Sequence, residues 1–189
     1  VADHQDRILW GGQLSRHIGR HQPFVYFLGN EDDTGARPRD PAQSYEYTSR
    51  YVGVGSRGML PVSGLEYRAE AVGEWGKTYS RGVASGRDRI CAWAVDMVLQ
   101  YRLDVPMRPK LTAEYLLASG DSDRAVSSSA TVGGNQPGTQ DNAFNAFGYR
   151  DTGVAFAGKV SNLQMIALGG SLFPLEQIRL FERMEIGSK

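Results

Sequence analysis

The sequence predicts an all-β fold, an antiparallel up-and-down transmembrane β-barrel with about eight strands in this chain, a number within the range of membrane barrels. Three observations support this prediction. The 189 residues include 23 glycines, a composition that suits strands and turns better than helices. Several segments alternate apolar and charged residues with a period of two, and none combines a 3.6-residue apolar period with helix caps. The connections between these segments are alternately short and long.

The expected strands are 7–16, 23–30, 50–59, 64–79, 89–103, 109–119, 161–173 and 177–187. The short connections lie around 17–22, 60–63, 104–108 and 173–176. Outer-membrane barrels join their strands by short periplasmic turns and long outer loops in this rhythm. We therefore expect residues 1–189 to be part of a single β-barrel domain, with long outer loops near 31–49, 80–88 and 120–160.

The central segments 64–79, 89–103 and 109–119 each have one apolar and one charged face, because side chains alternate across a strand. Aromatic residues at the two ends of the apolar face resemble the girdles of a lipid-facing wall. The girdle residues are Trp75 and Trp93 toward the long loops and Tyr67 and Tyr101 toward the short turns. We expect both tryptophans to be exposed at one level. In the alternative, a small soluble barrel, the same residues are ordinary core aromatics. The segments nearer the chain ends are mixed.

Composition limits the other possible functions. The 21 basic and 21 acidic residues balance, which gives no reason to expect a nucleic-acid partner. Cys91 is the single cysteine, so no internal disulfide can form. No stretch reaches the roughly 18 apolar residues of a membrane helix, and barrel strands do not need one.

Motifs for catalysis or metal binding are weak. Gly53 to Gly58 matches the glycine spacing of a dinucleotide loop, but a turn follows where a helix is needed. The glutamates of 64–79 could pair with Glu114 for glycosidase chemistry, yet Arg68 among them favours a charge-compensated wall. We therefore predict neither an enzyme nor a metal site. The acidic loop runs Glu31–Asp33 and Asp121–Asp123 remain candidate ligands for a loosely bound calcium ion, without EF-hand spacing.

Two stretches carry a family resemblance. One is Pro109-Lys-Leu-Thr-Ala-Glu-Tyr-Leu-Leu-Ala-Ser-Gly-Asp121, and the other is Phe144-Asn-Ala-Phe147 followed by Gly148, Asp151-Thr-Gly153 and Ser161-Asn-Leu-Gln164. Together, over about residues 64–187, they resemble the C-terminal half of the alginate-export family of bacterial outer-membrane barrels. The resemblance implies a barrel of about eighteen strands that passes an anionic polysaccharide through a charged lumen. The chain is too short for that, and it has neither a leader nor a terminal aromatic. We expect a part of a larger barrel, with a complete eight-stranded barrel as the alternative.

The leading hypothesis is an outer-membrane porin or exporter for a polar, anionic solute or an alginate-like polysaccharide, with outer-membrane lipid as its surroundings. A soluble β-rich carbohydrate-binding module and a barrel-borne hydrolase are the other hypotheses. Candidate lumen cations are Arg68, Lys77, Arg102, Lys110, Arg179 and Arg183, and the counter-charges are Glu66, Glu70, Glu74, Asp96, Glu114 and Glu185. We also expect Arg68, Arg102 and Lys110 to form one basic rung near the short turns. Finally, 7–16 and 177–187 should not pair with each other.

Overall fold

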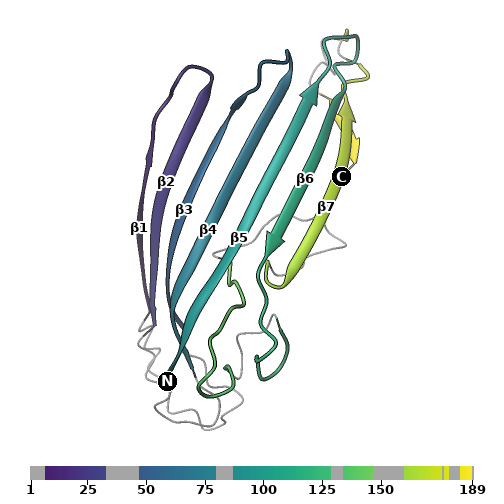
Figure 1. The fold of residues 1–189 in the computed structure, drawn as a ribbon. Helices are drawn as coiled ribbons and strands as arrows, with labels where there is room; N and C mark the ends of the chain where they lie inside the picture. Colours follow the sequence, from purple (N-terminus) through teal and green to yellow (C-terminus); the bar gives the residue numbers. More distant parts are fainter. Residues whose placement is uncertain are drawn as a thin grey trace, which may run out of the picture.

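In the computed structural model, one antiparallel sheet contains all eight strands, ordered as they occur in the sequence (Figure 1). The structure describes residues 7–32, 47–79, 87–128, 134–146, 160–175, 177–178 and 184–188. The strands are β1 Arg7–Ser15, β2 His21–Asp32, β3 Tyr47–Met59, β4 Leu65–Tyr79, β5 Arg87–Arg102, β6 Lys110–Ala118, β7 Leu163–Leu172 and β8 Ile186–Ser188. The prediction of an all-β up-and-down fold is confirmed.

The two edges of the sheet are β1 and β8. Within the described residues, β1 pairs with β2 and β8 pairs with β7, and no pairing joins β1 to β8. This agrees with the expected lack of pairing between the first and last segments, and the sheet does not close into a barrel. The described residues also include no helix with the length and hydropathy that a membrane span requires.

The last strand differs from its prediction. The expected strand was 177–187, but β8 covers only Ile186–Ser188, and 177–178 lie in a turn. After Pro174 the chain bends, and the Ile178 amide donates a hydrogen bond to the Leu175 carbonyl at 3.0 Å. Proline has no amide hydrogen and therefore cannot extend the ladder. Residues 179–183 lie outside the described part of the chain.

The turns that follow β1, β3 and β5 lie at one end of the sheet, and the ends of β2, β4 and β6, from which the longer connections begin, lie at the other (Figure 1). The turns 60–64 and 103–109 need left-handed backbone, with φ values of 77° at Gly64, 66° at Met107 and 40° at Arg108. Such values favour glycine in short hairpin loops. Short and long connections therefore alternate from β1 to β4 and again at 119–162, whereas 80–86 and 103–109 are equally short and the last connection, 173–185, is longer than predicted.

The register separates the residues of the sheet into two faces. Directly opposed pairs such as Gly73 with Trp93 and Val54 with Ala71 put their side chains on the same side. We call this side the apolar face. Its exposed members run across the sheet: Ile8, Trp10, Leu14, Val25, Val52, Val54, Trp75, Trp93, Met97, Leu99, Tyr101, Leu111, Ile166, Leu168, Leu172 and Ile186. The exposed apolar residues of the strands nearest the chain ends therefore lie on the same face as those of the central strands.

The opposite side, the charged face, carries Glu66, Arg68, Glu70, Glu74, Asp96, Lys110 and Glu114. Its long-loop end is nevertheless buried and partly apolar. Tyr47, Tyr51, Ile90, Ala92, Ala94, Ala118 and Phe144 form a core cluster there. Phe144 belongs to the connection between β6 and β7, so this connection covers that end of the charged face.

Candidate functional site

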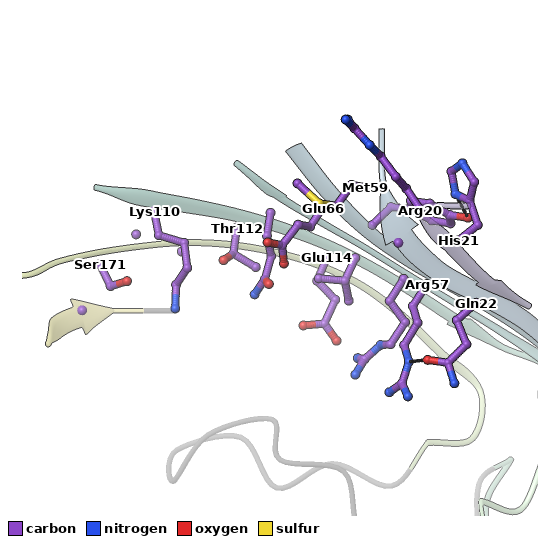
Figure 2. Close-up of a pocket in the computed structure, with 18 of the residues that line it drawn as sticks. Arg20, His21, Gln22, Arg57, Met59, Glu66, Lys110, Thr112, Glu114 and Ser171 are labelled. Carbon is purple, nitrogen blue, oxygen red and sulfur yellow. Dashed lines mark hydrogen bonds between the residues drawn. The ribbon is translucent and has the colours of Figure 1, made fainter. Parts of the chain in front are cut away.

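A hollow of about 850 Å³ lies over the short-turn end of the charged face. Strands from one edge of the sheet to the other contribute to its lining. The lining includes Gln22, Arg57, Arg68, Gln100, Lys110, Thr112, Glu114, Ser171 and Glu185. In Figure 2, Gln22, Arg57, Lys110, Thr112 and Glu114 point to one side of the strands, whereas Arg20 and His21 point to the other. The hollow is therefore a broad polar surface, accessible along the sheet.

Two arginines face each other in this hollow. Arg57 of β3 lies directly opposite Arg68 of β4, and like charges in this position repel each other. Arg68 is within 3.3 Å of the Asp96 carboxylate. Arg57 instead donates a hydrogen bond from Nε to the neutral Gln22 Oε1 at 2.8 Å. Among the described residues no carboxylate lies within ion-pair distance of Arg57, so its charge is available to an anion in the hollow.

Two further pairs of opposite charge lie at the hollow. Arg102 Nη2 lies 3.4 Å from Glu66 Oε1, and Lys110 Nζ lies 2.8 Å from Glu185 Oε1. The hydrogen bond from Lys110 lowers the pKa of the exposed Glu185 carboxyl, with a further contribution from the Ser171 hydroxyl. Such exposed pairs are weak and screened by salt. A passing ion can therefore compete for either partner.

At the long-loop end, residues 134–146 are fixed onto the charged face and onto the edge of β5. β6 ends at Ala118, which leaves the first part of β5 without that neighbour. Asp141 takes its place: its amide donates to the Arg89 carbonyl, and its carbonyl accepts from the Cys91 amide, each at 2.8 Å. This edge pairing satisfies backbone groups that would otherwise remain open.

Glu74 holds the same segment from the wall side. Its carboxylate accepts hydrogen bonds from the Tyr47 hydroxyl at 2.8 Å, the Tyr51 hydroxyl at 2.9 Å and the Asn145 amide at 2.8 Å. The Tyr51 hydroxyl also lies 2.7 Å from the Asn145 carbonyl oxygen, and its ring packs edge-on against Phe144. The charged face is thus closed by protein at this end and open at the other.

A buried ion pair joins this segment to Arg124, which follows β6 in the chain. Arg124 Nη2 and Nε lie 2.6 and 2.9 Å from the two carboxylate oxygens of Asp141, and both side chains are almost completely buried. Burial raises the pKa of the Asp141 carboxyl, while Arg124 and the Ala143 amide oppose that rise. The Arg124 guanidinium also lies 6.0 Å above the Tyr47 ring.

The model of the family described as alginate export matches residues 8–184. The chain belongs to the alginate-export family. The resemblance inferred from two motifs is therefore confirmed, and the match begins well before residue 64, where the resemblance began. No curated protein matches the chain.

Membership of this outer-membrane export family gives the predicted lumen residues a context, and the structure places most of them on the charged face. Glu66, Arg68, Arg102, Lys110 and Glu114 border or line the hollow. Glu70 accepts a hydrogen bond from the Tyr26 hydroxyl at 2.5 Å and lies opposite Asp96. Arg179 and Arg183 lie outside the described residues.

Three expectations need correction. Lys77 lies opposite Arg89 and has the strand parity of Trp75, so it belongs to the apolar face. Glu74 is only 2% exposed and is occupied by the loop segment, so it cannot meet a solute. The proposed rung of Arg68, Arg102 and Lys110 is not level. Arg102 and Lys110 are opposite each other, whereas Arg68 is opposite Val98, about 13 Å further along β5 at four residues.

The four girdle aromatics lie on the apolar face as expected. Trp75 and Trp93 are 39% and 47% exposed on adjacent strands, two residues apart in register. Tyr101 is exposed at the short-turn end, and Tyr67 is half-buried beneath His21 and Ser56. The predicted exposure of both tryptophans is confirmed, but their offset of two residues means that they do not lie at one level.

Two of the candidate calcium ligands, Asp121 and Glu31, have protein partners. Asp121 accepts the amides of Asp123 and Asn142 at 2.7 Å each, and Glu31 lies 3.6 Å from Arg50. In the described ranges no group of three metal-ligating side chains comes together. Asp33 lies outside them.

Arg57 is a candidate site residue that sequence reasoning missed. Its segment alternates as the central ones do, with Val52 and Val54 on one face and Tyr51 and Arg57 on the other. This alternation could have assigned Arg57 to the charged face. The glycines between these residues obscure it, because they have no side chain on either face.

Proposed function

We propose that the chain forms part of the wall of an outer-membrane pore that exports an anionic, alginate-like polysaccharide, and that it acts without catalysis. The charged face would line the lumen, and the apolar face would meet lipid. Family membership supports the class of function. The separation of charged and apolar side chains onto opposite faces supports the assignment of the charged face to the lumen and of the apolar face to lipid.

The exposed apolar side chains favour a membrane over a soluble carbohydrate-binding barrel. A soluble barrel would bury its apolar face and expose its charged face. Here Leu14, Ile166 and Leu168 on the apolar face are 71–76% exposed. Water would penalise such an apolar surface, and lipid would not.

Arg57 carries the proposal for an anionic solute. It is an exposed cation without a carboxylate partner among the described residues, and it is next to a second arginine. A carboxylate or a sugar acid could accept two parallel hydrogen bonds from such a guanidinium. The weak pairs around it, such as Lys110 with Glu185, allow several shallow binding positions, which favours transit over retention.

Ion selectivity in planar bilayers tests this proposal on the intact protein. Arg57→Gln should lower the anion-to-cation permeability ratio by about two- to threefold, the effect of one charge at about 7 Å in water. Glu185→Gln should raise the ratio, because Lys110 loses its partner. Lys77→Gln, on the apolar face, is the control and should leave the ratio unchanged.

Alginate oligomers added to the same bilayers provide the substrate test. They should interrupt the current through the wild-type pore and do so less through Arg57→Gln. A protein that inserts but never conducts would refute the pore. A conducting pore with an unchanged ratio in Arg57→Gln would remove Arg57 from the path.

A further inference from the structure

A second basic cluster lies on the apolar face, away from the hollow. Arg50 of β3, Lys77 of β4 and Arg89 of β5 are exposed on three neighbouring strands at the long-loop end. Lys77 is directly opposite Arg89, and it is also directly opposite Thr48, two residues from Arg50. The three cations therefore form one compact patch, which we call the outer basic patch.

This patch has too little negative charge of its own. Directly opposed residues have Cβ atoms about 4.5–5.5 Å apart and diagonal neighbours about 7–8 Å, so the three cations repel one another. Glu31 lies 3.6 Å from Arg50, with both side chains about half-exposed. In the part of the chain that the structure describes, no carboxylate lies within 4 Å of Lys77 or Arg89. An external anion would relieve this repulsion.

The surroundings indicate that the anion carries acyl chains. Trp75 lies opposite Arg50 and two residues before Lys77, so Arg50 lies at the Trp75 level, and Lys77 and Arg89 lie about 7 Å beyond it. From there to Tyr67, the same face of β4 holds only alanine, glycine and aromatic side chains. Tryptophan marks the interface of a membrane, and basic side chains just beyond it lie at the level of the head groups.

We propose that Arg50, Lys77 and Arg89 bind the phosphate groups of a phosphorylated glycolipid in the outer leaflet, with its acyl chains along the belt below Trp75 and Trp93. This proposal rests on the proposed function, because it needs the long-loop end to face the outside of the cell. A guanidinium can bind a phosphate through two parallel hydrogen bonds, and an ammonium adds a point charge.

The patch is separate from the export path. Lys77 and Arg89 point to the apolar face, whereas Arg57 and Lys110 of the hollow belong to the charged face. A polysaccharide in the lumen could not reach the patch. A lipid beside the barrel could reach it and could not reach the hollow.

Thermal unfolding of the purified intact protein in a neutral detergent tests the proposal, with lipid A as the probe. Bisphosphorylated lipid A should stabilise the wild-type protein, and phosphatidylglycerol should stabilise it much less. The triple variant Arg50→Gln, Lys77→Gln, Arg89→Gln should bind lipid A about one to two orders of magnitude more weakly, given roughly fivefold for each basic residue near an anionic surface. Removal of both phosphates from lipid A should have a similar effect on the wild type.

The control variant is Arg57→Gln, which removes a cation from the other face and should bind lipid A as the wild type does. Equal binding of lipid A by the wild type and a folded triple variant would overturn the proposal. Equal stabilisation by phosphatidylglycerol and lipid A would overturn the commitment to the glycolipid. Bilayer conductance of the triple variant distinguishes failure of the lipid proposal from failure of the proposed pore. The triple variant should conduct normally.

Discussion

Replacing Arg124 by Met should detach residues 134–146 from the charged face. The substitution removes the partner of Asp141, whose carboxylate is fully buried and receives both contacts from Arg124, at 2.6 and 2.9 Å. Loss of one partner of a buried ion pair costs about 3–5 kcal/mol, because the other charge is left without compensation. Local opening of the segment should therefore become about 10² to 10⁴ times more frequent.

Hydrogen exchange of backbone amides measures this opening directly. The Asp141 amide, bonded to the Arg89 carbonyl, and the Phe144 amide, bonded to the Ser119 carbonyl, report on the segment. The protection factors of these two amides should fall by about 10² to 10⁴. Amides in the middle of β4 and β5 should keep theirs, because their pairing does not involve Arg124.

The pH dependence gives a second check. Burial already raises the pKa of the Asp141 carboxyl, and loss of Arg124 should raise it further. A group with a raised folded pKa gains stability as the pH falls, because protonation removes the buried charge. The protection lost in Arg124→Met should thus be greatest above the raised pKa and should partly return as the pH is lowered through it.

The double variant Arg124→Met, Asp141→Asn separates the buried charge from simple loss of packing. The Ala143 amide donates a hydrogen bond to Asp141 Oδ1 at 3.1 Å, and asparagine keeps an oxygen that can accept it. Most of the protection should return, since no unpaired charge remains. Unchanged protection in Arg124→Met, or a double variant no better than the single one, would refute the reasoning.

Two further predictions concern the sheet itself. Met97→Arg places a charge midway along the exposed apolar face of β5 and should cost about 2–4 kcal/mol of stability in lipid, measured by urea unfolding in vesicles. Gln100→Arg, on the charged face of the same strand, should cost little, and an equal cost would contradict the assignment of faces. Gly64→Ala should destabilise the protein by about 1–3 kcal/mol, because φ is 77° and a Cβ would lie 2.1 Å from the Arg102 carbonyl oxygen. Gly73→Ala meets nothing within 4 Å and should leave the urea midpoint nearly unchanged.

Part of the site could be predicted from alternation alone. In β4 and β5 the period of two assigned Glu66, Arg68, Asp96 and Arg102 to one face, and the structure agrees. The register of neighbouring strands was not available from the sequence. It decides that Arg68 lies opposite Val98, far from the level of Arg102.

The sequence by itself determined the class of fold and the family, because these depend on local periodicity and on motifs that are continuous in the chain. Only the tertiary structure decided that Glu74 is buried under Asn145 and that Arg57 faces Arg68. These results depend on contacts between segments far apart in the sequence. Solvent access to a charged side chain is a property of what packs over it, and no pattern within its own strand contains that information.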